Sequence, residues 1–499
     1  MSAHEGVVAA PDTRPVRVAG LSWPLVLGAA AFLAVCAHGV WLSDQDVYLH
    51  VAVGRWIIGH GYVPRHDPYS FTMRGAPWVV QEWGSELLSV LAYSMAGWSG
   101  LVFLGAACFG LTLAYLMRFL LQRLEPLHAL VLCSLAASMM LPNLVDRPHE
   151  FVWPLTVVWI GGLVRASEEG RAPSWWLLGV MLLWVNMHAS FILGLGLMVP
   201  LALDSIESGG AKPLEAVRLW LPFCVAATAI ALLNPRGYEL LLFPFRILGI
   251  KEMMLYFRDW KPPDLQHPQP LDLWLILVIG AAFAGRIRLS LSRAVTVLGL
   301  LYMALEHFRH IALLGMISPL LLASPVARQW PMSRPGEAGA ATLDRWFHAL
   351  SAPARAASIC MTLALVCPAA AIATHARNPQ PLALYAPRAA LAAILSRVPR
   401  PRIFNDVNFG DYLIFRGLPV FVDARADMYG QAFLKRTFAA MALAPDGDVQ
   451  SLLAKYKVNA ILLMPTLAVV RLINRLPGWQ RVYRGRWAVA YVRRERRTS

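Results

Sequence analysis

The apolar runs of this chain are long enough to be membrane-spanning helices, and they recur along most of its 499 residues. A spanning helix needs roughly 20 apolar residues. Eleven runs approach that length: 20–42, 98–121, 126–145, 150–166, 173–190, 191–206, 214–233, 271–286, 291–306, 307–325 and 354–374. A composition with 57% hydrophobic and 15% charged residues agrees with this pattern. The sequence predicts a polytopic α-helical membrane protein with about 11 transmembrane helices, although Asn186 and His188 could instead mark a break within the pair 173–206.

Arginines in the short loops predict the orientation. Arg14 and Arg17 precede the first run, and further arginines fall in every second connection, as is typical of cytoplasmic loops. These further arginines are Arg118, Arg123, Arg165, Arg171, Arg286, Arg288, Arg293, Arg328, Arg334 and Arg345. Residues 1–19 are then a cytoplasmic tail. The segments expected outside are 43–97, 146–149, 187–191, 234–270 and 306–310. The odd number of runs also places the C-terminal part outside.

The first outer loop, 43–97, is too long for a simple connection, so we assign it with residues 20–374 to the transmembrane domain. Val47–Gly59 and Gln81–Ala96 alternate apolar and polar residues at helical spacing. The sequence predicts two amphipathic helices on the membrane surface, separated by a Gly- and Pro-rich turn around Tyr62–Pro77.

Residues 375–499 form a separate expected domain, because short apolar segments replace the long runs. Expected strands are Arg402–Asn405, Asp411–Phe415, Pro419–Asp423, Asn459–Met464 and Trp487–Arg493, and expected helices are Gly430–Leu443, Asp448–Tyr456 and Thr466–Leu476. This alternation predicts a small α/β domain with a partly parallel sheet. The acids of Asp423–Gly430 close a strand, where a sheet either binds a ligand or simply turns into a helix.

Charge and cysteine content narrow the possible partners. With 20 Lys/Arg and 7 Asp/Glu, residues 375–499 carry +13 of the net charge of +15. Anionic lipid heads, a phosphorylated lipid substrate or an ordinary basic surface fit this charge, whereas no motif supports nucleic-acid binding. The six Cys all lie in apolar stretches, so we expect no disulfide framework or Cys metal site.

Five polar clusters interrupt the apolar runs, and all can be placed at the outer face. They are Ser43–Asp46, Asp146–Glu150, Asn186–His188, Asn234–Arg236 and Glu306–His310. A site at a membrane surface would have this distribution of polar residues.

Asp44 and Asp46 follow the first run directly. A carboxylate there can deprotonate an acceptor hydroxyl or bind a metal ion, and it can equally cap the next helix. The other outer acids, Asp67, Glu82 and Glu86, favour a functional cluster.

Asp146, Arg147 and His149 lie in a very short outer connection. Ionisable groups beside hydrocarbon cost on the order of 2.5–3.5 kcal/mol each at the bilayer centre, so we expect them to face a polar cavity. Arg147 can bind a phosphate through its forked donors. A helix start is the alternative, because Pro148 and Glu150 suit a first helical turn.

Three further residues complete the candidate set. His188 lies in an apolar context, where a structural role is the alternative to a ligand role. Arg236 either follows a helix stop or binds phosphate. Arg309 lies in a cluster in which Glu306 and His310 could share a helical face, as metal ligands or within an ion-pair network. The sequence contains no specific metal signature; a divalent cation is possible, with Asp44 and Asp146 as candidate ligands.

Several segments resemble a known family. "LSDQDVYLHVAVGRWIIGHGYVPRHDPYSFT" and the following Glu82-Trp83 resemble the first outer loop of bacterial GT-C membrane glycosyltransferases, which include polyprenyl-phosphate-mannose protein mannosyltransferases and lipid-modifying relatives. "RPHEFVWPL", "WVNMHASFILGL", "NPRGYELLLFP" and "FNDVNFGDYLIFRGLPVFVDARADMYG" resemble a branch with an extracytoplasmic C-terminal domain. The resemblance implies an acidic residue after the first span, matched by Asp44 or Asp46, and a second acidic site, matched by Asp146. The adjacent Asp-Glu pair of the mannosyltransferases is replaced by Asp44-Gln45-Asp46.

The resulting hypothesis is a glycosyltransferase of the bacterial cytoplasmic (inner) membrane. It would transfer a sugar from a polyprenyl-phosphate-linked donor to an extracytoplasmic acceptor. In this hypothesis Asp46, or alternatively Asp44, is the base; Arg147, Arg236 and Arg309 neutralise the lipid phosphate; and Asp146, His149, Glu82 and His188 bind substrate. The alternatives are a transporter or flippase for a lipid-linked or anionic solute, and a non-catalytic envelope-assembly protein. The sequence specifies neither the sugar nor the acceptor.

Overall fold

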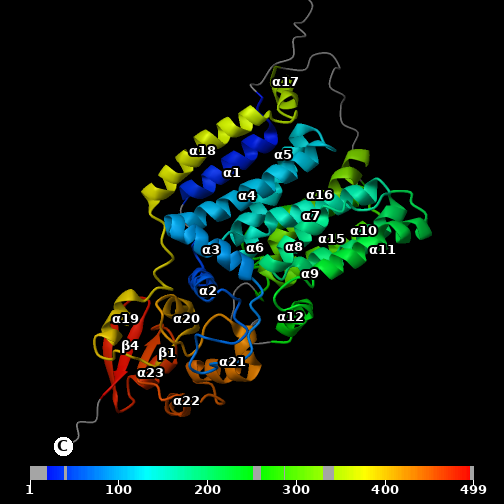
Figure 1. Cartoon of the computed structure of the whole chain (residues 1–499). Coiled ribbons are helices and arrows are strands. Elements are labelled where there is room, and N and C mark those ends of the chain that lie inside the picture. The colour runs from blue at the N-terminus through cyan, green and yellow to red at the C-terminus, as the bar shows by residue number, and fades with distance from the viewer. Residues whose placement is uncertain are drawn as a thin grey trace, which may run out of the picture.

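The computed structural model describes residues 20–38, 42–145, 147–250, 260–285, 287–329 and 342–494. A bundle of long helices forms one part of the molecule, and a smaller domain with a sheet lies at one end of the bundle (Figure 1).

Every predicted apolar run contains a helix. The helices of the runs are α1 (Trp23–His38), α4 (Trp98–Leu121), α5 (Pro126–Met140), α7 (Trp153–Glu168), α8 (Leu177–Met187), α9 (Phe191–Gly196), α10 (Met198–Glu207), α11 (Pro213–Ile230), α14 (Pro270–Phe283), α15 (Leu291–Glu306), α16 (Ile311–Gln329) and α18 (Ala356–Arg377). In the described part of the chain, five segments are long and apolar enough to cross a membrane: Trp98–Leu121, Pro126–Asn143, Pro213–Ile230, Phe308–Gln329 and Ala356–Arg377. Trp23–His38, Leu177–Met187 and Pro270–Phe283 are shorter apolar helices. The predicted polytopic helical fold class is confirmed.

Helix α4 lies at the centre of the bundle, between α1 and α7 (Figure 1). Its contact with α1 is close because glycines face each other. A Cβ on Gly110 would lie 2.7 Å from the carbonyl oxygen of Gly28. Small residues allow this approach, as is common where helices pack in membranes.

A buried ion-pair network joins the far ends of α4 and α7. Arg293 Nη2 lies 2.9 Å from Asp204 Oδ2 and 3.1 Å from Glu168 Oε1. Arg123 Nη2 lies 2.8 Å from the other carboxylate oxygen of Glu168. These pairs link helices α4, α7, α10 and α15 at the end away from the sheet-bearing domain.

The helices of segment 173–206 are interrupted at His188, where the sequence left open either two spans or a break. Helix α8 ends at Met187, His188 is extended with a φ of −165°, and α9 begins at Phe191. Trp184 Nε1 donates to Ser190 Oγ at 3.0 Å and closes the turn. Segment 173–206 is therefore a helical hairpin whose turn carries His188.

The two helices of the first outer loop are α2 (Asp46–His60) and α3 (Trp83–Ala96), as predicted. Helix α2 was expected to be amphipathic, but it is buried over most of its length between α3 and α20 (Val407–Phe415). Val47, Leu49, Val51 and Val53 point to different sides of the helix, so its burial requires packing all round.

The C-terminal domain contains a four-stranded sheet in the order β1-β2-β4-β3. Its strands are β1 (Ile403–Asn405), β2 (Ala460–Leu463), β3 (Trp479–Arg484) and β4 (Val489–Arg493). Strands β1 and β2 are parallel and the other pairs are antiparallel, so the predicted partly parallel sheet is present. The domain's helices are α19 (Arg388–Leu395), α20, α21 (Ala426–Ala442), α22 (Val449–Lys455) and α23 (Val469–Ile473).

Two details of that prediction differ from the structure. Asp411–Phe415, expected as a strand, lies in helix α20, because Asp406 caps the helix by accepting from the N–H of Asn408 at 2.9 Å. Pro419–Asp423 does not form a strand; only Val420 makes isolated bridges. Strand β3 was not predicted.

The first outer loop extends this sheet. Ser70 bridges Val420, with Phe71 N–H donating to the Val420 carbonyl at 3.0 Å and Val420 N–H donating to the Tyr69 carbonyl at 3.2 Å. Trp78, helix α2 and the C-terminal domain also share one hydrophobic core, distinct from that of the bundle. The loop and the C-terminal domain therefore lie on the same side and pack as one unit.

Candidate active site

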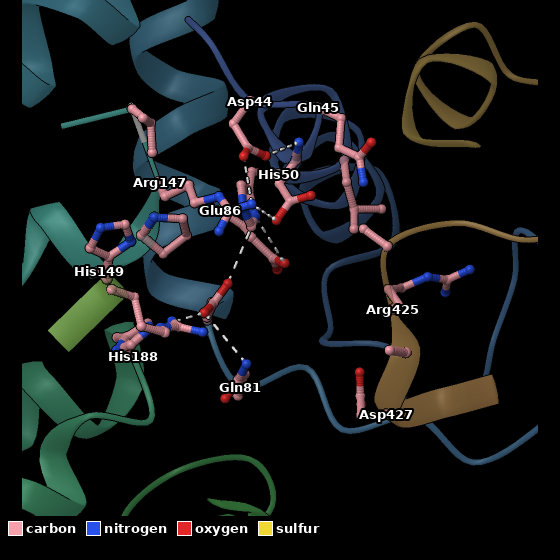
Figure 2. A pocket seen from close by; sticks show the side chains of 18 of the residues that line it. Asp44, Gln45, His50, Gln81, Glu86, Arg147, His149, His188, Arg425 and Asp427 are labelled. Atoms are coloured by element: carbon pink, nitrogen blue, oxygen red, sulfur yellow. Dashed lines mark hydrogen bonds and ion pairs between the residues drawn. The ribbon is translucent and has the colours of Figure 1, made fainter. Parts of the chain in front are cut away.

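A cavity of about 560 Å³ lies where the helical bundle, the first outer loop and the C-terminal domain meet. Figure 2 shows charged and polar side chains pointing into it from all three parts. Seven predicted site residues line it: Asp44, Asp46, Glu82, Arg147, His149, His188 and Arg309. Segments that are more than 250 residues apart in the sequence thus share one polar space.

Arg147 joins the two aspartates that follow the first span. Its Nη2 atom lies 2.6 Å from Asp44 Oδ2 and 3.2 Å from Asp46 Oδ2. Asp44 also accepts from the backbone N–H of Asp46 at 2.8 Å, so it fixes the start of α2. Asp44 therefore both accepts from the first N–H of α2 and contributes to the site.

One carboxylate oxygen of Asp46 can accept a proton from a substrate. Its Oδ2 atom is held by Arg147, whereas its Oδ1 atom has no hydrogen-bond partner among the described residues. A buried carboxylate oxygen without a partner is costly, so it is expected to accept from a bound group. This difference favours Asp46 over Asp44 as a base.

The connection before α7 orients Arg147. The Glu150 carboxylate accepts from the backbone N–H of Arg147 at 3.3 Å and from that of Val145. Pro148 is the first residue of helix α6 (Pro148–Phe151). The helix-start role and the cavity role therefore coexist here. Asp146 lies outside the described residues.

His149 and His188 form a neutral pair at the cavity wall. Their ring centroids are 6.3 Å apart, and the Nε2 atom of His149 donates to the Asn143 carbonyl at 3.2 Å. Burial lowers the pKa of both rings well below its usual value, and the positive charge of Arg309 lowers it further. At neutral pH both rings are uncharged hydrogen-bonding groups.

Glu82 lies between two histidines. Its Oε1 atom is 3.4 Å from Nε2 of His188, and its Oε2 atom is 3.9 Å from Nδ1 of His50. Burial, reinforced by the charge of Asp46, raises the pKa of Glu82 to about 8. Glu82 therefore holds a proton at neutral pH.

His50 and Glu86 are site residues that were not in the predicted set. Nδ1 of His50 lies 3.9 Å from Glu86 Oε1, and burial raises the pKa of Glu86 to about 7. A signal was present in the sequence: Glu82 and Glu86 are four residues apart, which places both on one face of α3.

Arg309 lies in the short 3-10 helix Phe308–His310, just before α16, and lines the cavity. Its guanidinium lies 5.0 Å from the Trp260 ring centroid. The predicted pairing of Glu306 with His310 on one helical face is wrong, because α15 ends at Glu306 and His307 is extended with a φ of −138°. The chain turns between the two residues, so they are not one helical turn apart.

The phosphate-binding role expected for Arg236 is also not supported. Arg236 is absent from the cavity lining, and its Nη2 atom pairs with Glu239 Oε2 at 2.9 Å. Asn234 accepts from the backbone N–H of Arg236 at 2.8 Å, which is the helix-stop geometry. The proline that follows Asn234 starts a turn rather than a binding loop.

The described donor set does not fit a divalent cation. The guanidinium of Arg147 takes the position between Asp44 and Asp46 that a metal ion would need. Among the described residues, no group of three or more His, Cys, Asp or Glu side chains is arranged so that it could hold a metal ion. The positive charge beside these carboxylates is therefore provided by arginine.

No protein-family model matches the chain, and no curated protein matches its sequence. Among solved structures, the crystal structure of ArnT from Cupriavidus metallidurans bound to undecaprenyl phosphate is similar, with 13% identity and a TM-score of 0.49 over 95% of this chain and 98% of that chain. The archaeal oligosaccharyltransferase AglB from Archaeoglobus fulgidus, in complex with an inhibitory peptide and a dolichol-phosphate, is also similar. There the identity is 11% and the TM-score 0.46, over 88% of this chain and 69% of that chain.

These are similarities of fold alone. At such identities and TM-scores they assign neither a family nor a substrate to this chain.

Proposed function

We propose that this chain is a membrane glycosyltransferase that uses a polyprenyl-phosphate-linked sugar as its donor. The observation that supports the proposal best is the cavity itself. There, a carboxylate oxygen of Asp46 that has no hydrogen-bond partner among the described residues lies beside Arg147, at the ends of membrane-spanning helices. A base and a phosphate-binding cation are the two groups that this reaction needs. We place the cavity at the extracytoplasmic face of the bacterial cytoplasmic membrane.

Asp46 acts as the general base in this proposal. The acceptor hydroxyl donates its proton to Oδ1 of Asp46 while its oxygen attacks the anomeric carbon of the donor sugar. The bond between that carbon and the lipid-phosphate oxygen breaks, and the electron pair leaves with the phosphate. Atoms and charge balance without a cofactor.

Arg147 and Arg309 stabilise the departing lipid phosphate. Both line the cavity, and the positive charge of each lowers the pKa of His149, so both lie close to the same part of the cavity wall. A fixed cation beside a developing phosphate dianion lowers the barrier more than it stabilises the bound donor. Neutral His149 and His188 and protonated Glu82 then supply hydrogen bonds without adding charge.

The test is transfer from a labelled undecaprenyl-phosphate-linked sugar in membranes containing the full chain. Asp46→Asn is expected to lower the rate by about 100-fold or more, since it removes the base. Asp44→Asn should reduce the rate less, because the base remains and only its support changes. Asp264→Asn, at an exposed acid on the same side, is the matched control and should transfer as the unaltered protein does.

Full activity of both Asp46→Asn and Asp44→Asn would remove the assigned base. Failure of the unaltered protein to transfer any labelled sugar, together with uptake of the lipid-linked sugar into reconstituted vesicles, would instead favour a transporter.

A further inference from the structure

The cavity has a second wall, contributed by the C-terminal domain, which the reaction above does not use. Asn408 of α20 and the segment Ala424–Asp427 line it. Figure 2 shows Asp427 across the cavity from Arg147, His149 and His188. The cavity therefore has Arg147 and Arg309 on the side of the bundle and Asp427 on the side of the C-terminal domain.

A buried ion-pair group holds this second wall in place. Arg425 donates through Nε to Asp423 Oδ1 at 2.8 Å and through Nη2 to Asp423 Oδ2 at 2.6 Å. Its Nη1 atom donates to Asp67 Oδ1 at 2.8 Å, across the contact between the C-terminal domain and the first outer loop. The Tyr429 hydroxyl donates to Asp423 Oδ2 at 2.7 Å. These bonds occupy Arg425 and Asp423, so neither is available to a substrate.

Aromatic packing adds to this rigidity. The Arg425 guanidinium lies 4.6 Å from the Trp78 ring centroid and 5.2 Å from that of Tyr69, both in the outer loop. The side chain is only 4% exposed. These contacts fix the backbone at Arg425. Asp427, two residues later, therefore has a fixed position at the cavity wall.

Asp427 itself forms no ion pair with any described residue of the chain. Burial raises the pKa of Asp427 to about 6, while the nearby Arg425 opposes this rise. The carboxylate is thus mostly ionised at neutral pH, and it lines the cavity. Gly430, with a φ of +72°, kinks α21 just beyond it and separates this first turn from the rest of the helix.

The charged side chains on the two walls favour different substrates: the lipid-phosphate donor on one wall and the acceptor on the other. An anionic lipid phosphate is attracted to Arg147 and Arg309 and repelled by Asp427. A neutral polyol has no such repulsion, and its hydroxyls are good donors to a carboxylate and to the side-chain amide of Asn408.

We infer that Asp427 and Asn408 form the acceptor-binding subsite, which holds hydroxyl groups of the acceptor across the cavity from the lipid phosphate. The inference rests on the proposed glycosyl transfer. It assigns the C-terminal domain to acceptor recognition and the bundle to the donor. Arg425 is then a positioning residue for Asp427.

The experiment measures transfer by the purified full chain in detergent, with labelled undecaprenyl-phosphate hexose as donor and an extract of bacterial envelopes titrated as acceptor. Binding of undecaprenyl phosphate alone is measured separately by thermal shift. Asp427→Asn is expected to raise the apparent KM for the extract about tenfold, with kcat and lipid-phosphate binding nearly unchanged, because a binding group rather than a reacting group is lost. Asp427→Glu should recover part of the affinity. Asp446→Asn, at an exposed acid of the same domain, is the matched control.

Each outcome supports or overturns the acceptor subsite. Unchanged acceptor dependence in Asp427→Asn, or loss of lipid-phosphate binding in parallel with transfer, overturns the acceptor subsite and leaves the glycosyltransferase proposal intact. Absence of transfer by the unaltered protein overturns both. If Asp427→Asn does not fold, Asn408→Ala takes its place, and an unchanged acceptor KM in that variant overturns the inference.

Discussion

Nε2 of His188 lies 3.4 Å from Oε1 of Glu82, and Nδ1 of the same ring accepts from the backbone N–H of Ser190 at 3.1 Å. Because Nδ1 is an acceptor, the proton of the neutral ring is on Nε2 and points toward Glu82. A neutral histidine does not stabilise an ionised carboxylate as a cation would. The pair therefore agrees with a Glu82 that stays protonated at neutral pH.

The raised pKa of Glu82 makes stability depend on pH. With a folded pKa of about 8 against a usual 4.5, the folded protein keeps a proton that the unfolded chain releases. Stability should therefore fall as pH rises from about 4.5 to about 8 and then level off. Glu82→Gln should flatten this slope and be more stable than the unaltered protein at pH 8. The gain is at most about 5 kcal/mol and is reduced by the 16% exposure of the side chain.

The measurement is the melting temperature in detergent between pH 5 and pH 9. Glu215→Gln, at an exposed glutamate, is the control and should leave the pH profile unchanged. Equal slopes for Glu82→Gln and the unaltered protein would show that Glu82 is ionised in the folded state.

Loss of the Arg147 guanidinium should strongly reduce transfer. In Arg147→Met, the carboxylates of Asp44 and Asp46 face each other without the cation that now lies within 3.2 Å of both. We expect a fall in rate of about 100-fold or more, as when one electrostatic donor is removed from an active site. Arg147→Lys should retain part of the rate, because a lysine supplies charge without the forked geometry.

Arg165→Met is the matched arginine control, since Arg165 bonds Gln122 at an exposed position. Rates are compared at saturating donor. Transfer by Arg147→Met within threefold of the unaltered rate would contradict the role of this arginine.

Two glycines of α2 should respond oppositely to alanine. A Cβ on Gly54 would overlap the carbonyl oxygen of Glu86 and lie 2.7 Å from Cγ1 of Val90, so Gly54→Ala must push α2 and α3 apart. We expect a destabilisation of about 1–3 kcal/mol and reduced transfer, because Glu86 moves with α3. Gly59, on the same helix, has nothing within 4 Å of its Cβ position. Gly59→Ala should stabilise slightly through helix propensity. Thermal unfolding of both variants checks the contrast; equal effects would argue against the close helix crossing.

Breaking the ion-pair group between the outer loop and the C-terminal domain should be costly. Arg425→Met leaves the buried carboxylates of Asp423 and Asp67 without their cation. Removal of one partner from such a buried group costs about 3–5 kcal/mol. Lys435→Met, which breaks the exposed contact with Asp446 at 3.8 Å, should have no measurable effect. Limited proteolysis and thermal unfolding report the change, and stability equal to that of Lys435→Met would rule out the group as a structural link.

Much of the site could be predicted because its residues lie at the ends of apolar runs. Asp44, Arg147 and His188 each follow or precede a span, and the alternation of spans places all three at one face. His50 was missed, and Glu86 and Asp427 were named as acids without a role in the site, because each lies within a helix, where composition does not show which side faces a cavity. Arg236, like Arg147, lies at the end of an apolar run, but it forms an ion pair with the neighbouring Glu239.

The sequence by itself determined the helices of the membrane part, the side on which the polar clusters gather, and the partly parallel sheet of the C-terminal domain. These follow from local periodicity, span length and loop charge, which are properties of short segments. Only the tertiary structure decided that α2 is buried, that Ser70 pairs beside Val420, and that Asp427 faces Arg147 across one cavity. Such contacts join residues hundreds of positions apart, and they depend on how whole surfaces pack, which no local pattern records.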